Sequence, residues 1–174
     1  MRCKTVRTEG LSEGDNLYAF QSTLLSPLPT QLKPCFTGLE RIRLRLRSLS
    51  GKYILYYIFG KERLAGYCFL KRGYLKRYSF LQKGDMLINP YYVAPPCRRN
   101  HYATIMLHAA TADRDTAWRR LWAVVASDNH ASAAALRKVG FQQVGFAEKT
   151  HWAYHLTMKP SRLTVFRIDR GLSD

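Results

Sequence analysis

The segment 93–104 constrains the fold most, because a strand end that runs through a double proline into a helix can be built in few ways. Pro95 and Pro96 are followed directly by Arg98 and Arg99 and then by an apolar helical pattern. The first backbone N–H groups of a helix have no acceptor within the helix. A helix start beside two arginines is therefore suited to bind an anion such as a diphosphate.

Length and composition limit the class of protein. The chain has 174 residues, 47% of them hydrophobic, which is enough for one compact core and short for two, so we predict a single domain over residues 1–174. No run approaches the roughly 18–20 apolar residues of a membrane span, and the first residues lack the apolar segment of a signal peptide. We therefore expect a soluble, cytoplasmic protein without a membrane partner.

The four cysteines are scattered with no Cys-x-x-Cys pair, which predicts neither a metal site nor a disulfide framework.

The charge is strongly positive and unevenly placed. The chain carries 28 Lys and Arg against 12 Asp and Glu, a formal net charge of +16. Between residues 41 and 83 the basic residues are opposed by a single acid, Glu62. An anionic partner is implied, and polycationic substrates such as polyamines become less attractive. The alternative is that these side chains only solvate an outer face.

The first half of the chain reads as helices followed by a hairpin. We predict a short strand at Cys3–Val6, a helix at 15–25 and a helix at Gly38–Leu49, where alternating arginines leave a strand as the alternative. The runs 52–59 and 63–70 are rich in β-branched and aromatic residues and flank a short turn, which indicates a hairpin.

The second half alternates strands and helices. A strand is expected near 78–81 or at Met86–Val93, and Pro90 requires it to be bulged or splayed, because proline cannot donate to a ladder. The later elements are a helix at 97–110, a buried strand at 121–126, a helix at 130–139 that Gly140 ends, and strands at 141–155 and 163–168. The fold class is a mixed α/β layer structure.

Two blocks of this pattern together resemble the acyl-CoA-binding core of the GNAT family of N-acetyltransferases. The first is the loop 98–103, in which Arg98 and Ala103 match the family pattern. In the second block the matching residues are Asn129, Ser132, Lys138, Gly140 and Phe141. The resemblance implies a mixed central sheet flanked by helices with a splayed, kinked central strand. It also implies transfer of an acetyl group from acetyl-CoA to a primary amine by direct attack on the thioester.

The resemblance carries a cofactor site with it. Backbone groups of the kinked strand, in residues 92–94, would bind the pantetheine arm, and the loop that follows would hold the pyrophosphate. The cofactor-binding residues it implies are Tyr92, Val93, Arg98, Arg99, Asn100, His101, Tyr102, Ala103, Thr104, Asn129 and Ser132. His101 stands where the family usually has its first glycine. A side chain there crowds the phosphates, although its N–H and imidazole can donate to them.

The catalytic groups depart from the family pattern. Leu136 replaces the tyrosine that often protonates the departing CoA thiolate, and an alkyl group cannot act as an acid. Chemistry alone nominates Tyr102, Tyr154 and His151 for that role. Asp85 is the carboxylate nearest the kinked strand, and Asp85, His151 and His155 are the candidate bases. Each has an alternative as a core or rim residue. A thiolate leaves tolerably without an acid, because thiol pKa values lie near about 8.5.

The sequence is also compatible with other functions. A GNAT-like fold without turnover could bind CoA or a partner, and the basic, tyrosine-rich composition also suits a nucleic-acid-binding module. Cys97, beside two arginines, is a candidate nucleophile, but no matching histidine motif accompanies it. The acceptor is expected to be anionic or small, for example an amino-sugar nucleotide or an amino-acid derivative. Exposed edge strands would permit a homodimer.

Overall fold

The computed structural model describes residues 3–23, 25–49, 53–60, 63–72 and 77–170. The chain divides into two compact units. Unit 1 comprises Met1–Lys71 and Pro90–Ala110, and unit 2 comprises Arg72–Asn89 and Thr111–Asp174. The single domain over residues 1–174 stays a prediction.

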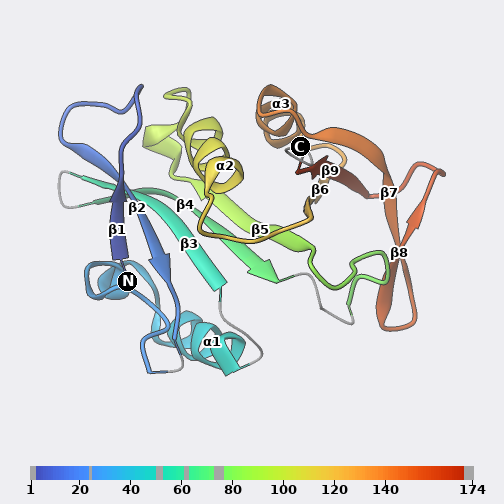
Figure 1. The fold of residues 1–174 in the computed structure, drawn as a ribbon, viewed down its shortest axis with the longest axis horizontal. Coiled ribbons are helices and arrows are strands. Elements are labelled where there is room, and N and C mark those ends of the chain that lie inside the picture. The colour runs from blue at the N-terminus through green and yellow to red at the C-terminus, as the bar shows by residue number, and fades with distance from the viewer. Residues whose placement is uncertain (1–2, 24, 50–52, 61–62, 73–76, 171–174) are drawn as a thin grey trace. The chain divides into compact units, whose positions relative to one another are not determined.

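Unit 1 is an antiparallel sheet with a helix on each face (Figure 1). Its elements are β1 (Cys3–Val6), β2 (Asp15–Gln21), a 3₁₀ turn (Thr30–Cys35), α1 (Gly38–Leu49), β3 (Tyr53–Gly60), β4 (Arg63–Arg72), the second half of β5 (Met86–Val93), a 3₁₀ turn (Pro95–Cys97) and α2 (Tyr102–Ala112). The strands lie in the order β1-β2-β3-β4-β5. Leu44 of α1 packs with Leu55 and Phe69, whereas Met106 of α2 approaches Gly66, which lies on the other face of β4.

Unit 2 is a mixed sheet that α3 covers on one face. Its elements are the first half of β5, β6 (Arg120–Ala126), α3 (His130–Lys138), β7 (Gln142–Thr150), β8 (Ala153–Thr157) and β9 (Leu163–Asp169), in the order β5-β6-β9-β7-β8. β5 runs parallel to β6, paired from Met86 to Ile88, and the other neighbours are antiparallel. Arg137 of α3 lies over the Phe166 ring, and Tyr78, Leu81 and Trp122 pack on the opposite face. This mixed sheet with flanking helices confirms the predicted fold class.

Most predicted elements are confirmed, but the helix predicted at 15–25 is wrong. Asp15–Gln21 is instead β2, paired with β1 on one edge and with β3 on the other. Side chains on both of its faces are buried, including Leu17, Ala19 and Phe20. A strand that is covered on both faces lacks the simple alternation of apolar and polar residues. The apolar residues of β2 happen to match helical spacing, which led to the wrong prediction. Residue 24 of the predicted helix lies outside the described residues.

Three other boundaries differ from the prediction. Helix α2 begins at Tyr102 and not at 97, because Arg99 and His101 adopt left-handed backbone conformations. The segment 141–155 is a hairpin of β7 and β8, and its turn uses His151 at a φ of 51° where a glycine would have signalled it. The segment 78–81 forms a turn with an isolated bridge between Tyr78 and Tyr154. The turn predicted at 61–62 lies outside the described residues.

Helix α1 presents its larger apolar face outward. It begins with a capping box, in which Thr37 and Glu40 bond each other's backbone or side chain, and the hydrogen bonds from Thr37 lower the pKa of Glu40. Leu44 is its buried apolar residue. Four large side chains that share the opposite face are 58–61% exposed: Leu39, Ile42, Leu46 and Leu49.

None of the described helices has the length and the apolar character that are needed to cross a bilayer.

Candidate active site

The second half of β5, beyond the residues 86–88 that pair with β6, directs some backbone groups away from β4. The N–H of Ala94 donates to the carbonyl of Ala65 on β4, at 2.9 Å. Backbone groups of successive residues point to opposite edges of a strand. Tyr92 therefore directs its groups toward β4, as its carbonyl contact with Gly66 also indicates, while Val93 directs its groups to the other edge.

The loop between β5 and α2 is exposed and folded in an uncommon way. Arg98, Arg99, Asn100 and His101 are all exposed. Arg99 and His101 have φ angles of 68° and 56°, in the left-handed region that few residues other than glycine adopt. A glycine at position 101 would adopt this conformation without steric cost. Exposed arginines therefore precede the start of α2, which contains Ala103 and Thr104. The backbone N–H groups of a helix start beside positive side chains suit the binding of an anion.

Replacing His101 by glycine should stabilise the protein. Glycine adopts a positive φ without steric cost, so we expect the free energy of unfolding to rise by about 0.5–1 kcal/mol. Urea unfolding of the full chain measures it. Asn100→Gly is the matched control, because Asn100 is exposed in the same loop without a positive φ and should lose stability by a similar amount. A shift in the same direction for both variants would contradict the strain at His101.

Two side chains beside this loop point into the interior. Tyr102 is 2% exposed, and its hydroxyl donates to Asp15 Oδ2 at 2.5 Å and lies 2.7 Å from Ser12 Oγ. Burial first, and then the hydrogen bond to Asp15, raise the pKa of Tyr102. Cys97 is also 2% exposed, so its sulfur is withheld from a substrate. The sequence did not predict the hydrogen bonds of Ser12 and Asp15 to Tyr102, because it placed Asp15 at the start of a helix.

In unit 2, α3 carries the second predicted block. Asn129 caps the helix, because its Oδ1 accepts from the backbone N–H of Ser132 at 3.1 Å. The cap leaves the two amide N–H donors of Asn129 for other partners. Gly140 has a φ of 94° and ends the helix, as predicted. Leu136, at the position where the family often has tyrosine, is completely buried.

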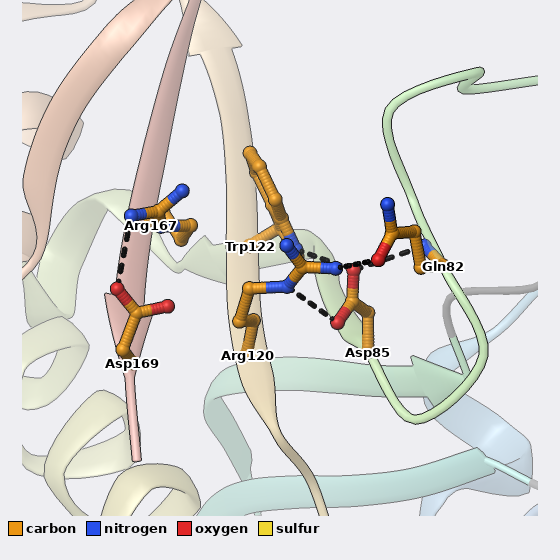
Figure 2. A network of polar contacts seen from close by, with 6 residues as sticks. All are labelled: Gln82, Asp85, Arg120, Trp122, Arg167 and Asp169. Atoms are coloured by element: carbon orange, nitrogen blue, oxygen red, sulfur yellow. Dashed lines mark hydrogen bonds and ion pairs between the residues drawn. The ribbon is translucent and has the colours of Figure 1, made fainter. Parts of the chain in front are cut away.

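The carboxylate of Asp85 is fully engaged in a buried network (Figure 2). Its Oδ1 accepts from Arg120 Nε at 2.8 Å, and its Oδ2 accepts from Trp122 Nε1 at 3.0 Å and from the Gln82 N–H at 2.9 Å. Figure 2 shows Arg120 and Trp122 reaching from β6 to the loop that carries Asp85. The Asp85 side chain is 0% exposed, and its hydrogen bonds are explained by a structural role.

Tyr154 and His151 lie on the β7–β8 hairpin. The Tyr154 ring is half-buried and stacks on Tyr78, with centroids 5.4 Å apart, and the Arg77 guanidinium lies 5.5 Å from it. Its hydroxyl has no hydrogen-bond partner among the described residues. His151 is exposed at the tip of the hairpin. Within the described ranges, no three His, Cys, Asp or Glu side chains are grouped so that they could hold a metal ion.

Comparison with known proteins places this geometry in a family. The model of the acetyltransferase (GNAT) family matches residues 20–141. No curated protein matches the chain.

Many solved structures are similar in fold. An acetyltransferase from Thermus thermophilus is 16% identical, with 98% of each chain covered and a TM-score of 0.58. Mycobacterium smegmatis RimJ in complex with CoA-disulfide is 17% identical, with 99% of this chain and 89% of that chain covered and a TM-score of 0.59. The putative acetyltransferase yncA from Salmonella typhimurium with acetyl-CoA is 16% identical, with 77% and 76% covered and a TM-score of 0.56. With the family model covering well over half of its length, the chain belongs to the acetyltransferase (GNAT) family.

Proposed function

We propose that this protein transfers an acetyl group from acetyl-CoA to a primary amine. The observation that carries the proposal is the exposed loop 98–101 before α2, in which Arg99 and His101 have left-handed backbones and which follows the second half of β5. Two proteins of similar fold support it, the one from Salmonella typhimurium with acetyl-CoA and RimJ with CoA-disulfide.

In this proposal the loop binds the cofactor diphosphate. The backbone N–H groups of Asn100, His101, Tyr102, Ala103 and Thr104 and the side chains of Arg98 and Arg99 surround the phosphates. The backbone of Val93 extends toward the pantetheine arm in the way an added strand would bind. In unit 2, Asn129 has two amide donors that its capping bond leaves unused, and Asn129 and Ser132 stay predicted cofactor ligands by the resemblance alone.

The reaction is a direct displacement. The neutral amine nitrogen forms a bond to the thioester carbonyl carbon, the carbon–sulfur bond breaks, and CoA leaves as a thiolate that takes up a proton. The amine loses one proton to a base or to water. Tyr102 is an inferior donor, because its pKa is raised and its hydroxyl is bonded to Asp15. We assign proton donation to Tyr154 and proton removal to His151, because the Tyr154 hydroxyl and the His151 ring form no hydrogen bond with any described residue.

The acceptor is an anionic or small amine. The charge of +16 and the exposed arginines of α1, Arg41, Arg43 and Arg45, favour a negatively charged molecule by electrostatic attraction. An amino-sugar nucleotide and an amino-acid derivative fit that description.

Calorimetric titration with acetyl-CoA tests the cofactor site. We expect one saturable site in the wild type and an affinity about tenfold or more lower in Arg98→Ala, because one charge-assisted contact to phosphate is lost. Arg41→Ala is the matched control, since Arg41 is exposed on α1 and should leave the affinity unchanged. If the two substitutions lowered the affinity equally, the loss would reflect only the net charge of the protein and would contradict a phosphate site at Arg98.

Thiol release then tests turnover. The wild type is expected to release CoA thiol when acidic amines are supplied and to release little with spermidine. Saturable acetyl-CoA binding without thiol release for any amine would instead identify a cofactor-binding protein without acetyltransferase activity.

A further inference from the structure

Unit 2 contains an open cavity of about 820 Å³ at the beginning of β6 and the end of β9. Its polar lining is dominated by arginine: Trp118, Arg119, Arg120, Arg167, Asp169 and Arg170 contribute to it. A volume of this order is typical of sites for small organic ligands. Nothing in the acetyl-transfer reaction uses these residues.

Two of the four arginines are neutralised within the protein. Arg120 is paired with Asp85 at 2.8 Å, and its Nη2 donates to Gln82 at 2.7 Å (Figure 2). Arg167 is paired with Asp169 at 2.9 Å. Both guanidinium groups also lie within 6 Å of the Trp122 ring, at 5.7 and 5.5 Å. The charges of these two arginines are therefore balanced by two carboxylates.

The other two arginines keep their charge. The backbone N–H of Arg170 donates to the carbonyl of Arg119 at 3.1 Å, which continues the β6–β9 ladder and sets the two residues opposite each other. Neither forms an ion pair with any described carboxylate. Like charges directly opposite each other on paired strands are destabilising. An anion bound between them would relieve that repulsion.

Arg170 is also held in place in advance. Its Nη1 donates to the carbonyl of Thr116 at 2.9 Å, its Nη2 donates to the carbonyl of Asp113 at 2.8 Å, and its guanidinium lies 4.5 Å from the Trp118 ring centre. Three of its five N–H donors remain for a ligand. A cation fixed by neutral carbonyls keeps its full charge and loses little conformational entropy when it binds an anion.

Trp118 adds an unused donor. The residue is 7% exposed, lines the cavity, and its Nε1–H has no hydrogen-bond partner among the described residues. A buried donor without a partner is uncommon and calls for an acceptor. A phosphate oxygen is an acceptor of the required kind.

We propose that this cavity is a binding site for a small phosphorylated molecule, with Arg119 and Arg170 as its charged anchors and Trp118 as a neutral donor. The site is separate from the predicted cofactor residues of unit 2, because the cavity lies where β6 begins and Asn129 follows the end of β6. A diphosphate or nucleotide matches both the volume and the pair of uncompensated charges.

Calorimetric titration with inorganic pyrophosphate tests the site. The full-length Arg98→Ala protein is used, so that the loop before α2 competes only weakly for pyrophosphate. One saturable site is expected, and the added substitution Arg119→Ala should weaken binding about tenfold, since a charge-assisted bond is lost. Arg119→Lys should recover part of the affinity. Arg119 is exposed and its side chain forms no described hydrogen bond or ion pair, so these variants should fold normally, which urea unfolding checks.

Arg114→Ala is the matched control, because Arg114 is an exposed arginine of unit 2 outside the cavity and should leave the affinity within about twofold. Equal losses for Arg114→Ala and Arg119→Ala would overturn the proposal, and so would the absence of saturable binding. A single-stranded oligonucleotide that displaces pyrophosphate with a steep salt dependence would also overturn it, in favour of a nucleic-acid surface. None of these outcomes depends on whether acetyl-CoA binds, so the two proposals fail separately.

Discussion

Replacing Asp85 by alanine is expected to lower the free energy of unfolding by about 3–5 kcal/mol. The substitution leaves the Arg120 guanidinium without its carboxylate and the buried indole N–H of Trp122 without its acceptor. It also frees the Gln82 N–H, which the same carboxylate binds. Removing one partner of a buried charged network costs more than the network contributes as a whole, because the remaining groups stay desolvated. Urea unfolding measures the change.

Asp169→Ala provides the comparison on the same face of the sheet. Asp169 pairs with Arg167 at a similar distance, but its side chain is 54% exposed, so the expected loss is about 0–1 kcal/mol. Similar losses for the two variants would contradict the buried network. Asp85→Asn, if folded, is expected to keep its rate of thiol release. A selective loss of that rate, with acetyl-CoA affinity intact, would instead make Asp85 the base.

Gly66→Ala should damage stability and cofactor binding together. A Cβ at this position would lie 2.8 Å from the Tyr92 carbonyl oxygen, closer than real Cβ contacts allow, and 3.0 Å from Met106 Cε, which is a tight contact. Since a backbone atom must move, we expect a loss of about 1–3 kcal/mol in the free energy of unfolding. The displaced segment carries Val93, so acetyl-CoA affinity should fall roughly tenfold as well. Urea unfolding and calorimetry measure the two effects.

Gly38→Ala serves as its control. Gly38 has no atom within 4 Å of an added Cβ and opens a helix, where alanine is favoured, so stability should be unchanged or slightly higher. The affinity for acetyl-CoA should stay the same. If Gly66→Ala were as harmless as Gly38→Ala, the close approach of β4 and β5 in unit 1 would be wrong.

The sequence predicted elements well where local signals agree with the tertiary setting. Asn129 and Gly140 bracket α3 with a cap at each end, and the buried run of β6 precedes them. It failed at β2, where burial of both faces hid the strand periodicity. It also failed at His151, because a histidine in the left-handed region gives no turn signal.

The candidate site was only partly predictable. The loop 98–101 is a contiguous motif, so its residues could be named in advance, whereas its left-handed conformation could not. The cavity arginines were counted only as part of the net charge. Arg119 and Arg170 become neighbours through strand pairing across some fifty residues, and no local pattern encodes that register.

Helix α1 also bears on how the protein evolves. Leu44 is the buried apolar side chain among the described residues of α1, while Leu39, Ile42, Leu46 and Leu49 face outward. Outward positions of a surface helix ordinarily drift toward polar residues, since the change costs the fold nothing and improves solubility. Selection for folding alone would therefore erode these four side chains first. If these four apolar side chains persist as the sequence diverges, their persistence would indicate selection for a function of this surface and not for folding.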